Sequence, residues 1–213
     1  MSNKILLLNL PSLPTQIEQV LVETCRSIPL KEQDRQWVNL FHKNELPIAA
    51  HSYGLQSAPI PKDVVEFIQQ YLKAYFGQEE LIMFVGILKN VVGQPSTSPP
   101  HCDRAREMAI NYVLSTGGDN VQTCFYKEHR EIHDITCAEN KYYKDCTLDF
   151  KIKFPEKVWH AYNVQRYHSV ENIEHERYLF SIKLKSNPTI DQFLVTHHHL
   201  VQTDQYMIDD LQS

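Results

Sequence analysis

Several features that mark whole classes of protein are missing from this chain of 213 residues. No run of apolar residues approaches the roughly 18 that a helix needs to cross a bilayer. The sequence starts with only a short apolar run, which lacks a small-residue cleavage pattern. From these absences we expect a cytoplasmic protein that follows no secretory route and contacts no membrane.

The local motifs of several common chemistries are absent as well. There is no Gly-rich phosphate loop, nucleophile elbow, zinc-finger spacing or internal repeat. The five cysteines form no C-x-x-C pair, and an odd number without an export signal indicates reduced thiols. Acidic residues outnumber basic ones by 26 to 21, and a net charge of −5 does not indicate a surface for nucleic acid, which is normally basic.

The chain is long enough for one sizeable core. With 42% hydrophobic residues, its composition suits a compact single domain. We expect one domain over 1–213, with N-terminal α/β support over 1–80, a β core over 81–186 and a C-terminal tail over 187–213.

Two kinds of hydrophobic periodicity predict the secondary structure. Apolar residues at helical spacing predict one helix over 14–26 and a second that Pro61 opens and Gly77 ends. Strands are predicted over the ranges 4–10, 37–41, 81–92, 108–114, 121–126, 147–154, 158–164 and 176–184.

The most informative pattern is the triplet His101-Cys102-Asp103. Alternate side chains of an extended segment share a face, so His101 and Asp103 point the same way and Cys102 points into packing. His168, far downstream, can complete a three-ligand face. Two imidazoles and one carboxylate, with the remaining positions open, suit non-haem Fe(II). We therefore predict a metal site formed by these three ligands.

A buried cation is predicted close after the third ligand. In the run 176–184, a period of two puts Arg177 and Ser181 on one face. A guanidinium that faces a core needs an anion, and its planar fork suits a carboxylate, to which a serine hydroxyl can add a contact. In the run 108–114 the even-numbered side chains share one face, and Tyr112 is the polar member of that face.

Together these residues resemble the Fe(II)- and 2-oxoglutarate-dependent oxygenases, in the branch that includes prolyl 4-hydroxylases. The resemblance covers about residues 81–185. It implies a mainly β fold with supporting helices, built on a double-stranded β-helix or jelly-roll core. It also implies that His101, Asp103 and His168 hold the iron.

The same resemblance implies a co-substrate site and a reaction. Arg177, helped by Tyr112 and Ser181, would hold the distal carboxylate of 2-oxoglutarate. The implied enzyme is a dioxygenase that uses dioxygen, converts 2-oxoglutarate to succinate and hydroxylates a substrate. Its substrate stays open between an amino acid, a protein side chain, a small metabolite and a nucleobase.

Two other classes of function are compatible with the metal ligands. A non-catalytic jelly-roll module would bind the metal without turnover. A zinc hydrolase could also use two histidines and an aspartate. Arg177 and Tyr112 count against the hydrolase, because zinc hydrolysis gives no reason for a carboxylate clamp at that place.

The polar segment 127–146 is long for a connection between two strands. Long irregular connections tend to carry binding function. We therefore expect this segment, together with the approach over 93–100, to border the metal site as a lid.

Overall fold

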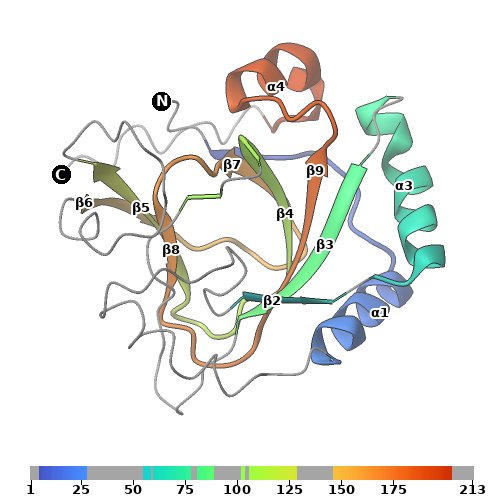
Figure 1. The fold of residues 1–213 in the computed structure, drawn as a ribbon, viewed down its shortest axis with the longest axis horizontal. Helices are drawn as coiled ribbons and strands as arrows, with labels where there is room; N and C mark the ends of the chain where they lie inside the picture. The colour runs from blue at the N-terminus through green and yellow to red at the C-terminus, as the bar shows by residue number, and fades with distance from the viewer. Residues whose placement is uncertain are drawn as a thin grey trace.

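The computed structural model of the protein describes residues 5–27, 55–58, 60–77, 81–88, 102–103, 106–128 and 146–202. Within these ranges the chain forms two antiparallel β-sheets and a small number of helices (Figure 1). No helix there has both the length and the apolar character that crossing a membrane requires.

The larger sheet has six strands and the smaller one has three. The order in the six-stranded sheet is β1 (Ile5–Leu7), β7 (Trp159–Asn163), β4 (Met108–Ser115), β9 (Arg177–Leu184), β3 (Leu81–Leu88) and β2 (Leu55–Ala58). The order in the three-stranded sheet is β6 (Cys146–Ile152), β5 (Gln122–Glu128) and β8 (His168–Glu171).

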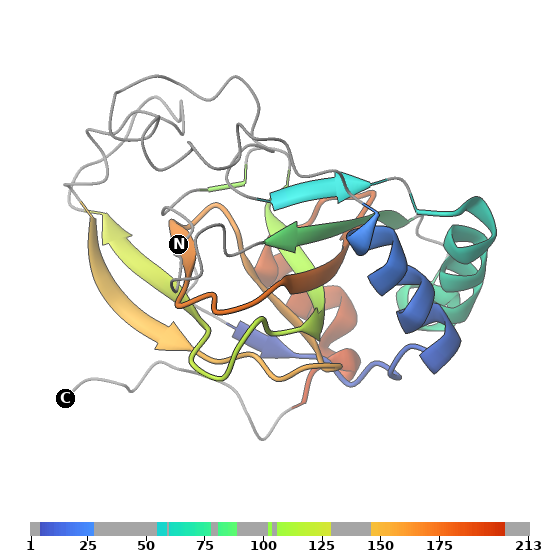
Figure 2. The same ribbon diagram turned by 90° about the horizontal axis from the view of Figure 1, so that it is seen from below.

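Successive strands of the core pass between the two sheets. From β4 the chain enters the small sheet at β5 and β6, returns to the large sheet at β7, crosses again to β8 and ends in β9. The two sheets lie opposite one another (Figures 1 and 2). This is the topology of a jelly roll, so the predicted fold class, mainly β with supporting helices, is confirmed.

Helices α1 (Thr15–Arg26) and α3 (Lys62–Phe76) cover the outer face of the six-stranded sheet. Each begins after a proline, at Pro14 and Pro61, whose fixed φ suits the entry to a helix. Helix α3 ends at Gly77, which has a φ of 70° that favours glycine. Both helices that the sequence predicts are therefore confirmed.

The six-stranded sheet is buried on both faces. On its outer face a large apolar cluster joins the helices to side chains such as Tyr112, Trp159 and Phe180. Its inner face meets the small sheet through a second cluster, in which Val113 packs with Phe125. Every residue of β4 except the last is consequently buried.

The segment 187–213 contains a helix within its described part, although the sequence pattern predicts only a tail there. Helix α4 (Ile190–His197) begins with a capping box in which Thr189 and Gln192 bond each other's backbone N–H groups. Phe193 of this helix is fully buried in the outer cluster. Helix α4 lies close to β7 and β9 (Figure 1).

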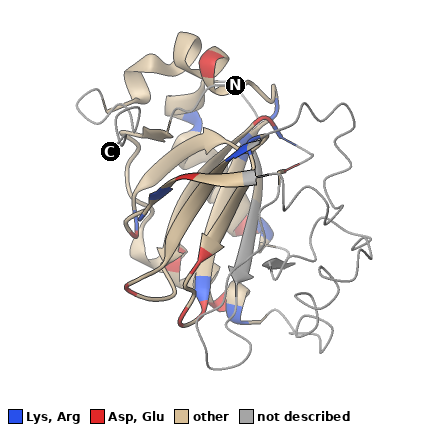
Figure 3. Ribbon diagram, turned by 90° about the vertical axis from the view of Figure 1, so that its left-hand side faces the viewer, with Lys and Arg blue, Asp and Glu red and all other residues tan. Residues whose placement is uncertain are grey.

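Charged residues of both signs are interspersed along the described ribbon (Figure 3). Several form ion pairs on the small sheet, where Lys127 pairs with Asp149 at 2.7 Å and Lys151 with Glu171 at 2.9 Å.

The inward-facing His160 makes stability depend on pH. Burial lowers the pKa of His160 to about 3, and its ring stacks on Phe154 with centroids 3.7 Å apart. An unfolded histidine has a pKa of about 6.5, so between these values only the unfolded chain binds the proton. Stability should therefore be complete above about pH 6.5 and fall as pH decreases toward 3, by up to roughly 1.4 kcal/mol per pH unit from this group.

Denaturant unfolding of His160→Phe and of the parent, measured from pH 7 to pH 4, checks this expectation. The variant should lose the part of the acid sensitivity that comes from His160, because phenylalanine can stack on Phe154 without titrating. Parallel pH profiles for the two proteins would contradict it.

Candidate active site

Asp103 lies on the segment that leads into β4, outside any strand. Its backbone N–H donates to the carbonyl of Val164, at 2.8 Å. Its Oδ2 accepts a hydrogen bond from Nε of Arg106, also at 2.8 Å. Both side chains are mostly buried, with exposures of 23% for Asp103 and 11% for Arg106. A guanidinium therefore holds one oxygen of this carboxylate in place.

His168 opens β8 and is buried. Its Nδ1 lies 2.9 Å from the carbonyl oxygen of Arg166. A carbonyl can only accept, so Nδ1 carries a proton, and in the neutral imidazole Nε2 is then the nitrogen with the lone pair. Metal-binding histidines usually have such a partner on the second nitrogen. The Tyr162 and His168 rings pack edge to face, with centroids 5.5 Å apart.

The third predicted ligand, His101, lies outside the described residues. Among the residues that are described, no group of three His, Cys, Asp or Glu side chains could hold a metal ion. Asp103 and His168 still supply a carboxylate and an imidazole whose Nδ1 is occupied by a hydrogen bond, and both are ligand types that suit Fe(II). Cys102, which lies between His101 and Asp103 in the sequence, packs against Tyr167, and this confirms its predicted role in packing.

Ser181 is buried on the inner face of β9 and belongs to a hydrogen-bonded chain. Its hydroxyl donates to Oδ1 of Asn111 at 2.6 Å and accepts from Nη1 of Arg106 at 2.6 Å. Through Arg106 this chain reaches Asp103. The structure thus connects the predicted carboxylate ligand with one member of the predicted co-substrate site.

Arg177 is 6% exposed at the start of β9, on the same face as Ser181. Its Nη1 donates to the carbonyl of Thr116 at 3.4 Å, and its buried Nε has no hydrogen-bond partner among the described residues. Burial lowers the pKa of Arg177, yet an arginine stays charged at neutral pH. A buried cation with an unsatisfied donor is costly unless an anion joins it.

Gly117 allows the turn after β4 to approach Arg177 closely. Its φ of +81° favours glycine, and an added Cβ would lie 2.8 Å from Cβ of Arg177. The close approach explains why a glycine stands at this place in the turn. The turn therefore packs closely against the backbone of Arg177, which carries the buried guanidinium.

Tyr112 does not lie beside Arg177 and Ser181. It is fully buried on the outer face of β4, where its ring contacts Trp159 and its hydroxyl donates to Oε1 of Glu18 at 2.5 Å. The other carboxylate oxygen of Glu18 pairs with Lys157 at 2.8 Å. In this structure Tyr112 attaches helix α1 to the sheet.

Tyr112→Phe tests this placement. The change removes the only hydroxyl donor to Oε1 of Glu18 among the described contacts, and a buried acceptor without its partner costs about 1–3 kcal/mol. We expect a loss of stability in denaturant unfolding together with unchanged binding of 2-oxoglutarate. Weakened binding at unchanged stability would place Tyr112 in the co-substrate site after all.

The sequence patterns did not identify Asn111 and Tyr162, whose side chains lie on the inner face of the large sheet, as candidate site residues. Asn111 occupies the face of β4 opposite to that of Tyr112, and its Oδ1 accepts a hydrogen bond from Ser181. Burial, and after it the charge of Asp103, raise the pKa of Tyr162 to about 12, so its hydroxyl stays protonated at neutral pH. In the sequence, the one sign of such a role was that each residue is polar within a mostly apolar strand, Asn111 in β4 and Tyr162 in β7.

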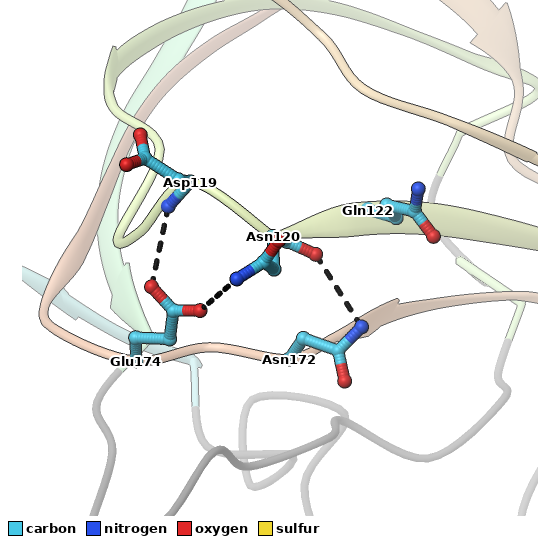
Figure 4. A pocket seen from close by; sticks show the side chains of 5 residues that line it. All are labelled: Asp119, Asn120, Gln122, Asn172 and Glu174. Atoms are coloured by element: carbon cyan, nitrogen blue, oxygen red, sulfur yellow. Dashed lines mark hydrogen bonds between the residues drawn. The ribbon is translucent and has the colours of Figure 1, made fainter.

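A separate polar hollow of about 500 Å³ lies between the turns that follow β4 and β8. Glu174 accepts from the backbone N–H of Asp119 at 3.2 Å and from the side chain of Asn120 at 2.7 Å (Figure 4). Asn172 donates to the carbonyl of Asn120 at 3.3 Å. These bonds fasten the two turns together, and the hollow contains none of the predicted site residues.

The predicted lid over 127–146 falls mainly outside the described residues, since β5 ends at Glu128 and β6 begins at Cys146. The approach over 93–100 and the predicted strand over 37–41 also lie outside them.

No protein-family model matches the chain, and no curated protein matches it in sequence. Solved structures that resemble it include a nickel complex of the non-haem monooxygenase ThoJ, at 10% identity and a TM-score of 0.42, covering 84% of this chain and 71% of that one. A prolyl-4-hydroxylase from Pseudomonas putida has 12% identity and a TM-score of 0.41, covering 84% and 89%. A prolyl hydroxylase from Trichoplax adhaerens, in complex with a hypoxia inducible factor peptide, has 12% identity and a TM-score of 0.42, covering 79% and 89%.

Proposed function

We propose that the protein is an Fe(II)- and 2-oxoglutarate-dependent dioxygenase that hydroxylates its substrate. The observation that carries the proposal is Arg177, a buried guanidinium with an unpartnered Nε on the inner face of the barrel. A dicarboxylate co-substrate would supply the anion that this cation lacks. Asp103 and His168 would supply two of the metal ligands, because a hydrogen bond to each side chain holds it in place.

In this proposal His101, Asp103 and His168 hold the iron. Arg106 donates to one oxygen of the Asp103 carboxylate, which favours coordination through the other oxygen alone. The carbonyl of Arg166 keeps the proton of His168 on Nδ1, so that Nε2 is the ligand atom.

The co-substrate would be held by Arg177 together with polar side chains on the inner face of the large sheet. These side chains are Asn111, Ser181 and Tyr162. Ser181 already donates a hydrogen bond to Asn111, and Tyr162 lies in the apolar cluster on the same inner face of the large sheet. The Tyr162 hydroxyl can donate to a carboxylate because it stays protonated at neutral pH. Tyr112 is not part of this group, since it bonds Glu18 on the other face.

When bound, Fe(II) and 2-oxoglutarate supply the oxidising chemistry, in which dioxygen is consumed, succinate and CO2 are released and a substrate C–H is hydroxylated. The chain itself provides orientation and a dry environment. Aromatic rings of Phe125 and Tyr162 lie within 6.3 Å and 5.5 Å of the His168 ring, centroid to centroid. They would limit the access of water to the reacting atoms.

Turnover of 2-oxoglutarate to succinate, measured with Fe(II), ascorbate and dioxygen, tests the proposal. The screen should include amino acids, peptides, small metabolites and nucleobases, with products analysed by mass spectrometry for a gain of about 16 Da, the mass of one oxygen atom. Succinate that requires both Fe(II) and dioxygen supports the proposal. Metal binding without any turnover across these classes would support a non-catalytic binding module instead.

A further inference from the structure

The segment that carries Asp103 precedes β4 and, in its described part, has no strand hydrogen bonds of its own, so other contacts must fix its position. Two backbone hydrogen bonds attach it to the turn between β7 and β8. The N–H of Asp103 donates to Val164 at 2.8 Å, and the N–H of Val164 donates to Glu107 at 3.2 Å. This turn also leads directly to His168.

Gln165 adds side-chain contacts at the same place. Its Nε2 donates to the carbonyl of Asp103 at 2.5 Å and to the carbonyl of Arg106 at 2.6 Å. An amide NH2 has two protons, so one group can serve both acceptors. Because both partners can only accept, the orientation of the amide is fixed by the contacts themselves.

The backbone of Gln165 is held as well, since its N–H donates to Oδ1 of Asn163 at 2.9 Å. Gln165 therefore sits on a fixed turn and holds the main chain at both ends of the segment from Asp103 to Arg106. From that main chain the Arg106 guanidinium reaches the Asp103 carboxylate.

We propose that Gln165 is a positioning residue of the metal centre, which sets the place of Asp103 relative to His168. The proposal rests on the metal site of the proposed function. Gln165 is three residues before His168 in the chain, and it touches the Asp103 segment directly. One side chain thus connects the two parts of the chain that would supply the ligands.

Titration of the metal-free full-length protein with Co(II) alone tests this role, with affinity and the visible spectrum of the bound ion as readouts. Gln165→Glu keeps the shape but places oxygen atoms against two carbonyls, and Gln165→Met removes the donors without adding charge. We expect each variant to bind Co(II) at least about 10-fold more weakly and to change its spectrum, as loss of outer contacts to metal ligands does elsewhere. Gln19→Glu, the same change at an exposed position of α1, is the matched control and should bind like the parent.

Thermal unfolding of the same metal-free proteins separates positioning from stability. If both Gln165 variants are folded at the titration temperature and bind Co(II) with parental affinity and spectrum, the inference is wrong, whatever their Tm. Should Gln165→Glu fail to fold, Gln165→Met decides alone. If His168→Ala binds Co(II) as tightly as the parent, the metal site is wrong, and with it the proposed function. If His168→Ala loses affinity for Co(II) but the Gln165 variants do not, only this inference is wrong.

Discussion

Arg177→Met is expected to remove most of the affinity for 2-oxoglutarate and to leave the ligand-free protein at least as stable as the parent. The two effects have opposite signs because the same guanidinium has opposite roles in the two states. Without an anion it is a buried cation with an unpartnered Nε, and an unsatisfied buried donor costs about 1–3 kcal/mol. With a carboxylate it forms a charge-assisted contact in a desolvated pocket.

Loss of one partner from such a buried pair costs at least roughly 2 kcal/mol, which corresponds to about 30-fold in affinity. Calorimetric titration with 2-oxoglutarate under anaerobic conditions, with Mn(II) in place of iron, measures the affinity. Thermal unfolding of the ligand-free proteins measures the stability, where we expect Tm to stay level or to rise by a few degrees.

Lys73→Met provides the control for this experiment, because it removes one positive charge at an exposed position of helix α3. It should affect neither affinity nor stability appreciably. If Arg177→Met bound 2-oxoglutarate as tightly as the parent, Arg177 would have no part in a co-substrate site.

His168→Ala is expected to abolish tight binding of Fe(II) and all metal-dependent turnover. It removes the imidazole whose Nε2 is the proposed ligand atom. Loss of an outer contact to a metal ligand costs 10–100-fold in affinity, so loss of the ligand itself should cost more than about 100-fold. Binding of Fe(II) under anaerobic conditions, followed by competition with a chelator, gives the measurement.

The matched control is His199→Ala, which removes an exposed histidine of the C-terminal region. It should bind Fe(II) like the parent. Because His168 is buried between aromatic rings, some loss of stability in the alanine variant is expected, and the titration must use temperatures at which it is folded. Parental affinity in folded His168→Ala would exclude this histidine as a ligand.

The helices and most strands could be predicted because their signals are local. Pro14, Pro61 and Gly77 mark helix boundaries through their own backbone preferences, and the structure has the boundaries there. Helix α4 had a local signal too, the capping box formed by Thr189 and Gln192. The prediction of a tail over 187–213 did not take this signal into account.

The face of a buried strand could not be predicted in this way. Strand β4 is covered by helices on one side and by the small sheet on the other, so apolar residues follow one another without alternation. Period-two reasoning groups Tyr112 with its even-numbered neighbours correctly, but gives no sign of which group faces inward. The structure turns Asn111 to the inside and Tyr112 toward helix α1.

By itself, the sequence determined the class of fold and the chemical types of the candidate site residues, because strand periodicity, helix boundaries and the H-x-D spacing are properties of short segments. Only the tertiary structure decided which residues meet. The bond from Arg106 to Ser181, the contacts of Gln165 with the Asp103 segment and the burial of Arg177 all join segments far apart in the chain. Such contacts depend on how two sheets close on one another, which no local pattern encodes.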